Sequence, residues 1–246
     1  MKDEKSSAHA KVLDRKWDDL RQAFAAAEQK RGGFKAQEGG YSYEASMFMP
    51  KMENDRLQLH LYDVIDDYWG CGPTGLVECL QNFPDSPIDL FVNSPGGYVY
   101  DGRAMASQLS RRDATAYIDG IAASAATTVV LAADDRYMAE GTKFMVHRAW
   151  GYSVGNKNEM ERYAEILDGV DNDLAAEYAK VTGKPQSEML ELMDAETYLS
   201  AKEAEEYGFA KTRATNVPAK AQARLNRDER VRTRDLLKFL DRHREH

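Results

Sequence analysis

The chain has 246 residues, of which 43% are hydrophobic and 30% are charged, and its formal net charge is −8. This composition is ordinary for a soluble globular protein. No run of about 18 apolar residues occurs and the first residues lack an apolar stretch, so we expect neither a membrane span nor a secretory signal. The two cysteines, Cys71 and Cys79, have no metal-site spacing and are too few for a disulfide framework, which favours a reducing, cytoplasmic setting.

Residues 1–46 are predicted to form a helix and a linker that precede the main domain. Between residues 11 and 30, apolar side chains recur at spacings of four and three, which gives a narrow apolar seam that needs a partner surface. The seam consists of Leu13, Trp17, Leu20, Phe24 and Ala27. Two Gly-Gly pairs follow it and are typical of a flexible linker.

Residues 47–212 alternate between strand and helix patterns. Strands are expected at 56–62, 87–93, 114–120 and 143–149, and helices at 73–82, 102–111, 123–133, 156–181 and 200–209. This alternation indicates an α/β domain with a largely parallel sheet. The helix at 123–133 is rich in small residues and is expected to be buried on all sides.

Residues 213–246 are predicted to form a basic helical tail. From Lys220 to His246 the tail holds nine Lys or Arg residues and five Asp or Glu residues, whereas the whole chain is acidic. A mixed-charge helix that faces solvent accounts for this pattern, and docking on an acidic partner is the alternative. The tail is the one segment for which a nucleic-acid partner is considered.

Three strand ends carry residues suited to chemistry. Ser124 follows one strand and starts the small-residue helix, where the N–H of Ala125 and the positive end of the helix would stabilise an anion. His147 ends a second strand. Ser124 alone would be read as a helix cap and His147 alone as a structural residue, but functional residues of parallel sheets gather at the carboxyl ends of strands.

The third strand end carries "NSPGG", with Gly96 and Gly97 in succession after a proline. Two glycines here favour a backbone that is kept open for close approach by another chain. The N–H of Gly97 would serve as a second oxyanion donor, and the bare backbone would let an extended peptide pair as an added strand.

Five motifs in this order resemble those of the proteolytic subunit of the Clp protease. They are "NSPGG", "GIAAS" with the serine in fifth place, "MVH", "TGK" and "YLSAKEAEEYGF", and the similarity extends from about Arg56 to Ala210. The resemblance implies a Clp/crotonase-type α/β spiral of stacked βαβ units, to which the helical amino- and carboxy-terminal extensions are added.

The resemblance also implies a role for individual residues. Ser124 would be the nucleophile, His147 the general base and Glu196 the acid, with Asp194 as the alternative acid; Gly97 and Ala125 would donate to the oxyanion. Peptide would lie between two backbone segments, formed by Gly96, Gly97, Tyr98 and Val99 on one side and by Arg148, Ala149 and Trp150 on the other. No metal or cofactor is needed for this chemistry. The helix at 156–181 matches the element that joins two rings in the family, so a homo-oligomeric ring is expected.

The chain also departs from the housekeeping members of that family. They usually carry His-Gln-Pro where this chain has His147-Arg148-Ala149, and Asp where it has Glu196. "AASAA", "MDAET" and the amino-terminal helix look more like the Clp-related proteases of tailed phages and prophages, which are associated with capsid maturation. We therefore expect a serine endopeptidase that processes capsid or scaffold proteins, in the cytoplasm or within a procapsid.

Three alternatives remain open at this point. The first is a housekeeping Clp subunit that works with an ATPase unfoldase. The second is a crotonase-type acyl-CoA enzyme, which shares the spiral fold and a two-amide oxyanion hole but does not need the Ser124–His147 pair. The third is a non-enzymatic assembly protein that keeps a relic site.

Overall fold

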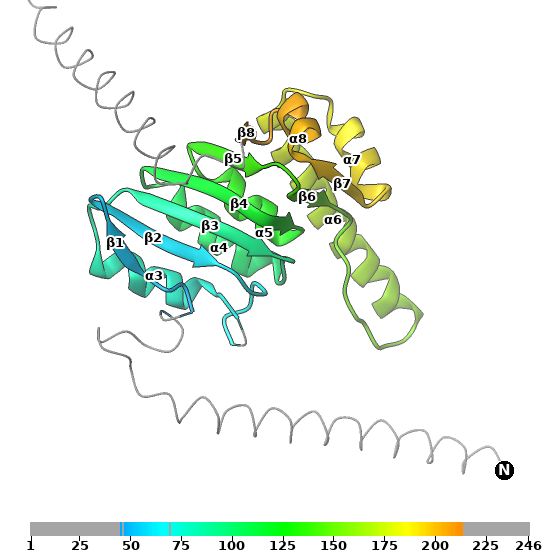
Figure 1. Ribbon diagram of the computed structural model, residues 1–246. Helices are drawn as coiled ribbons and strands as arrows, with labels where there is room; N and C mark the ends of the chain where they lie inside the picture. Colours follow the sequence, from blue (N-terminus) through cyan, green and yellow to red (C-terminus); the bar gives the residue numbers. More distant parts are fainter. Residues whose placement is uncertain (1–44, 46, 69, 214–246) are drawn as a thin grey trace, which may run out of the picture.

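In a computed structural model of the protein, residues 45, 47–68 and 70–213 are described (Figure 1). The strands in this part are β1 (Lys51–Glu53), β2 (Arg56–Leu61), β3 (Ile88–Ser94), β4 (Ala114–Ala123), β5 (Asp135–Ala139), β6 (Lys143–Val146), β7 (Thr197–Ser200) and β8 (Lys211–Arg213). The helices are α3 (Pro73–Asn82), α4 (Val99–Leu109), α5 (Ala125–Leu131), α6 (Lys157–Thr182), α7 (Gln186–Asp194) and α8 (Ala201–Tyr207). The apolar seam, most of the linker and the basic tail lie outside the described residues.

Within these ranges the strands form one eight-stranded mixed sheet. Its main order is β1-β2-β3-β4-β5-β8, and β6 branches off between β4 and β7. β2, β3, β4, β5 and β8 are parallel, while β1 is antiparallel to β2. Parallel neighbours need crossover connections, and α3, α4 and α5 provide them in turn. The sheet and its crossovers confirm the α/β fold that the alternating pattern predicts.

Strand β4 is long enough to pair with different neighbours along its length. Thr115–Ile118 pair with β5, whereas Ile121–Ala123 pair in parallel with Lys143–Met145 of β6. On its other side, Ala122 lies opposite Ser94 at the end of β3. The segments that follow β3, β4 and β6 therefore leave the sheet at the same edge.

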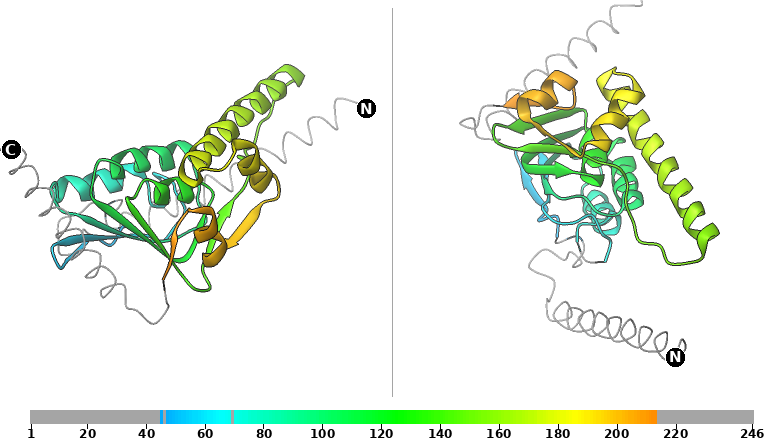
Figure 2. Two further views of the ribbon diagram at one scale, coloured as in Figure 1. Left: turned by 90° about the horizontal axis from the view of Figure 1, so that it is seen from above. Right: turned by 90° about the vertical axis from the view of Figure 1, so that its right-hand side faces the viewer.

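Helices α3, α4 and α5 cover one face of the sheet, as Figure 2 shows from above. The main core lies between these two layers and is built from aliphatic residues such as Leu59, Leu90, Met105 and Val129. Every residue of α5 is buried, as the small-residue pattern predicts. On the opposite face of the sheet, Phe91, Tyr117 and Tyr137 form a second, smaller cluster of stacked rings.

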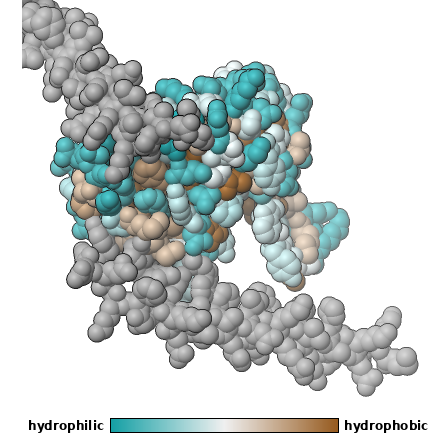
Figure 3. All heavy atoms as spheres, in the orientation of Figure 1, coloured by the Kyte–Doolittle hydropathy of each residue, from teal (hydrophilic) through white to brown (hydrophobic). Residues whose placement is uncertain are grey.

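Helix α6 begins outside the body of the domain and ends inside it. Figure 2 shows its first turns as an arm that projects beyond the sheet and the other helices, and Figure 3 shows this arm standing clear of the body. Its buried residues all lie in its second half: Val170, Asp171, Leu174, Ala175 and Tyr178. A capping box of Asn156 and Glu159 starts the helix, and left-handed Gly183 ends it.

Several elements differ from the sequence-based expectation. The third expected strand continues past Gly120 to Ala123, and β1, β5, α7, β7 and β8 were not predicted. β1 and β8 have only three residues each, too few to show an alternating pattern. Ala45 is fully buried, so the packed part of the chain includes a residue just before the expected start at 47. None of the described helices is long and apolar enough to cross a membrane.

Candidate active site

Ser124 stands at a sharp bend between β4 and α5. Its φ of 55° and ψ of −129° are unusual for a residue with a side chain. The bend is held by the Ser124 N–H, which donates to the Met145 carbonyl at 3.0 Å, and by the Ser124 carbonyl, which accepts from the Thr127 N–H at 2.9 Å. The strand therefore turns directly into the helix, without the short connecting turn that the sequence suggested.

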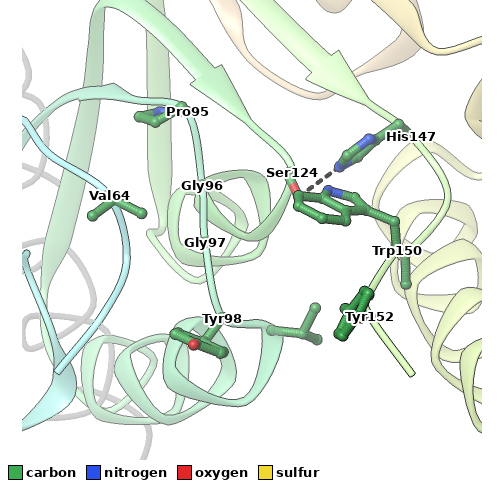
Figure 4. Close-up of a pocket in the computed structure, with 12 residues that line it drawn as sticks. Val64, Pro95, Gly96, Gly97, Tyr98, Ser124, His147, Trp150 and Tyr152 are labelled. Carbon is green, nitrogen blue, oxygen red and sulfur yellow. Dashed lines mark hydrogen bonds between the residues drawn. The ribbon is translucent and has the colours of Figure 1, made fainter. Parts of the chain in front are cut away.

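His147 follows β6 and reaches the hydroxyl of Ser124. The distance between His147 Nε2 and Ser124 Oγ is 2.8 Å (Figure 4). β4 and β6 are paired, with Ala123 opposite Met145 near their ends. Ser124 and His147 come just after these two strands, so their side chains lie at the same edge of the sheet. A neutral imidazole that accepts from a hydroxyl at this distance is in position to remove its proton.

The glycine segment runs beside Ser124 in a conformation that only glycine tolerates. Gly96 and Gly97 have φ values of 89° and 154°. A Cβ at Gly96 would lie 2.7 Å from the Cβ of Ser124 and 2.9 Å from the nitrogen of Ala125, and a Cβ at Gly97 would lie 2.1 Å from the Ile65 carbonyl oxygen. The two glycines therefore permit the close approach that the sequence motif predicts.

Hydrogen bonds to Ile65 determine which way the backbone of Gly97 points. The Ile65 N–H donates to the Gly96 carbonyl at 2.8 Å, and the Tyr98 N–H donates to the Ile65 carbonyl at 2.9 Å. In a parallel bridge of this kind, the residue between these two groups directs its own N–H and C=O to the other side. The N–H of Gly97 thus faces away from Ile65. The N–H of Ala125, the first residue of α5, has no partner within its helix.

Fewer main-chain groups are available to pair with peptide than the sequence suggested. The N–H of Tyr98 is already used, and Val99 is the first residue of α4. On the opposite side, the N–H of Ala149 donates to Asp171 at 2.6 Å. These residues contribute to the pocket mainly as its walls, and Gly97 is the residue of the glycine segment best placed for main-chain pairing.

A cavity of about 480 Å³ opens in front of the Ser124–His147 pair. Figure 4 shows the glycine segment on one side of it and Trp150 and Tyr152 on the other. It is lined by Val64, Pro95, Gly96, Gly97, Tyr98, Val99, Ser124, His147, Ala149, Trp150, Gly151 and Tyr152. Val64, Pro95, Gly151 and Tyr152 were not predicted from the sequence. Tyr152 could have been predicted from Trp150, because residues two apart in an extended segment lie on the same side.

The two candidate acids occupy different surroundings. Asp194 is the last residue of α7, and its carboxylate accepts from Arg148 Nε at 2.7 Å and from Nη2 at 3.0 Å. These bonds from the guanidinium lower the pKa of Asp194 below its usual value. Residues 194–196 end a helix and turn, so they are not the extended segment that would point both acids the same way.

Glu196 comes just before a strand that pairs with β6. β7 is antiparallel to β6, with Thr197 opposite Val146, so continuing the register by one residue would place Glu196 opposite His147. Its carboxylate accepts from the Tyr198 hydroxyl at 3.2 Å, and its φ is 47°. In the described part of the chain, neither Glu196 nor Asp194 forms a hydrogen bond with His147.

The described residues hold neither a metal-binding cluster nor a reactive thiol. No cluster of three or more His, Cys, Asp or Glu side chains there is arranged to hold a metal ion. Both cysteines are buried, and burial raises the pKa of Cys71 to about 11 and that of Cys79 to about 12. Thiols with such high pKa values stay protonated at neutral pH and are poor nucleophiles.

The fold agrees with comparisons to known proteins. The family model described as Clp protease matches residues 74–216. A solved structure of a ClpP1 point mutant from Listeria monocytogenes has the same fold, with a TM-score of 0.57 and 23% sequence identity; the match covers 65% of this chain and 92% of that one. The chain belongs to the Clp protease family.

Curated relatives include the ATP-dependent Clp protease proteolytic subunits of three Dehalococcoides mccartyi strains. Each is 33% identical over 130 residues, which is 51% of this chain. The match spans 65% of each relative's length. The family resemblance inferred from the five motifs is thereby confirmed.

Proposed function

We propose that the protein is a serine endopeptidase. The observation that carries the proposal is the 2.8 Å contact between Ser124 Oγ and His147 Nε2 at the side of a 480 Å³ cavity, next to the glycine segment. Membership of the Clp protease family supports the same chemistry.

In the proposed reaction, His147 takes the hydroxyl proton as Ser124 Oγ attacks a peptide carbonyl. The carbonyl oxygen becomes an oxyanion, which the N–H groups of Gly97 and Ala125 stabilise. The protonated imidazole then gives its proton to the leaving amine, and an acyl-enzyme remains. Water activated by His147 hydrolyses this ester and restores the free serine.

Glu196 is the acid proposed to orient His147. The proposal is supported by the register of β6 and β7, which would put Glu196 opposite His147 if continued by one residue, and by the bonds that already hold Asp194 to Arg148. A carboxylate in this place would fix the imidazole tautomer and stabilise the imidazolium as it forms. For this contact the Glu196 side chain would have to turn away from Tyr198.

The substrate proposed is protein, and the working form is a homo-oligomeric ring. The departures at Arg148, Ala149 and Glu196 support a role in processing phage capsid or scaffold proteins. The relatives are named as subunits of an ATP-dependent protease, which supports an alternative in which an unfoldase delivers the substrate. Mass spectrometry of neighbouring gene products, co-expressed with wild type or with Ser124→Ala, separates the two by showing which proteins are cut.

A fluorophosphonate probe tests the proposed peptidase directly. The wild-type protein should be labelled on Ser124, and Ser124→Ala should not be labelled while it keeps the same assembly state. Crotonase-type chemistry does not require a reactive serine, and an assembly protein with a relic site should not react. An unlabelled, correctly folded wild-type protein would rule out the peptidase.

A further inference from the structure

Helix α6 carries a buried carboxylate that the proposed reaction does not use. Asp171 is only 4% exposed, although it lies on a helix rich in charged residues. One of its oxygens accepts from the Ala149 N–H at 2.6 Å, and the other accepts from Arg148 Nη1 at 3.3 Å. Burying a charge is unfavourable unless it is paired and hydrogen-bonded, so the two partners explain why it is tolerated.

Arg148 joins this buried carboxylate to a third segment of the chain. Its Nε and Nη2 grip both oxygens of Asp194 in the bidentate arrangement that a guanidinium favours. We call Arg148, Asp171 and Asp194 the Arg148 clamp. It connects the residue after His147 with the middle of α6 and the end of α7.

The Arg148 clamp lies just beyond the paired ends of β6 and β7. β6 ends at Val146 and β7 begins at Thr197, so the contact between Arg148 and Asp194 lies just outside the paired strands. Farther along the loop, Gly151 lies against Tyr163 of α6. The approach is so close that a Cβ at position 151 would come 1.8 Å from the hydroxyl oxygen of Tyr163. Side-chain bonds to α6 and α7 thus take over from strand pairing just beyond the histidine.

We propose that the clamp positions His147 for catalysis, an inference that rests on the proposed peptidase activity. Arg148 and the bonded Ala149 N–H fix the backbone immediately after the imidazole. Asp194 fixes the start of the turn that carries Glu196. Housekeeping members usually have proline at the position of Ala149, in His-Gln-Pro. A proline has no N–H and could not donate the hydrogen bond that Ala149 gives to Asp171. Arg148, Ala149 and Asp171 therefore act as one unit in this chain.

Three variants and one matched control test the proposal. Arg148→Met removes both halves of the clamp, Asp194→Asn weakens the outer half, and Asp171→Asn keeps an acceptor for Ala149 but removes the charge. The control is Asp173→Asn, which breaks an ion pair with Arg103 at 3.2 Å, two residues further along the same helix and outside the site. Circular dichroism and thermal melting confirm that each variant is folded.

The expected result is a loss in rate without an equal loss in binding. Arg148→Met should lower kcat and the rate of Ser124 labelling by about 10-fold to 100-fold, because displacing a reacting group by ~1 Å costs up to ~10²-fold. KM should change little, and Asp173→Asn should behave as wild type. Asp171→Asn should lie between them, since it keeps the bond to Ala149. Adding Asp194→Asn to Arg148→Met should cost little more, because both remove the same contact.

A folded Arg148→Met protein with wild-type kcat and labelling rate would overturn the inference. Asp194→Asn is a surface change and keeps the test valid if Arg148→Met does not fold. A third measurement does not depend on turnover: the rate at which diethylpyrocarbonate modifies His147, followed by mass spectrometry across pH. If wild type fails to react with the fluorophosphonate, the peptidase proposal fails, and an unaltered His147 profile in Arg148→Met then rejects the clamp separately.

Discussion

The two halves of the candidate site are held in place by different means. Ser124 is fixed by main-chain structure: a central strand, a fully buried helix and the Met145 carbonyl surround it. β6 places His147 at its end, but the loop beyond the histidine depends on side chains, because it is anchored to α6 through Asp171 and Arg148. Trp150 and Tyr152 on this loop are 79% and 77% exposed.

This difference shows how one site combines a rigid group with an adjustable one. Moving Ser124 would require a break in the hydrophobic core, whereas moving the loop that carries Trp150 requires only the loss of a few polar contacts. Substitutions in the serine half should therefore act on chemistry or folding as a whole. Substitutions in the histidine half should act in graded steps.

Replacing the nucleophile gives the largest expected effect. Ser124→Ala and Ser124→Gly should both lose hydrolysis, by up to ~10⁶-fold. Glycine should also relieve the backbone strain at φ 55°, so Ser124→Gly should be more stable than Ser124→Ala by about 1 kcal/mol. Peptide hydrolysis and thermal unfolding measure the two effects. A Ser124→Gly protein that melts well below Ser124→Ala would contradict the strained-bend interpretation.

The acid in the histidine half is tested by comparing two conservative variants. Glu196→Gln should lose activity by ~10²–10⁴-fold if Glu196 orients the imidazole. Asp194→Asn should lose no more than about 10-fold, because it acts only through the Arg148 clamp. Steady-state peptide hydrolysis gives both values. A larger loss in Asp194→Asn than in Glu196→Gln would reverse the assignment, and two small losses would indicate a Ser–His dyad.

Replacing Gly97 with alanine tests the proposed oxyanion donor in the serine half of the site. Gly97→Ala should lower kcat by ~10²–10³-fold, because the Cβ would clash with the Ile65 carbonyl and displace an oxyanion donor. Gly141→Ala is the control: its φ is also positive, at 87°, but a Cβ there meets nothing within 4 Å. If both variants kept wild-type kcat, the N–H of Gly97 would not be an oxyanion donor.

The smallest effect on activity is expected from a substitution at Trp150, on the exposed wall of the cavity. Trp150→Ala should lower kcat/KM for peptides with bulky apolar residues by about 10-fold, through loss of apolar contact area rather than loss of chemistry. Tyr100→Ala removes an aromatic ring that is similarly exposed, at 69%, but lies outside the cavity, and should have no effect. An equal response in both variants would mean that Trp150 does not contact substrate.

The sequence by itself predicted an α/β domain with a largely parallel sheet, and it singled out Ser124 and His147, which the structure brings into contact. Alternating strand and helix patterns gave the α/β fold because the period of apolar residues reflects which faces are buried. Ser124, His147 and Gly97 were found because each follows a strand, and parallel strands end at one edge. Family motifs added Glu196, which no local pattern distinguishes from other surface acids.

Only the tertiary structure decided how the histidine half is built. Arg148, Asp171 and Asp194 lie far apart in sequence, and nothing in a charged helix indicates which carboxylate will be buried. The bend at Ser124 was likewise hidden, since the apolar run "GIAASAA" fits a strand or a helix and only pairing with β6 extends β4 to Ala123. The alternation of strands and helices follows from local pattern, whereas the end of a strand and the charge pairing between segments depend on how the chain packs.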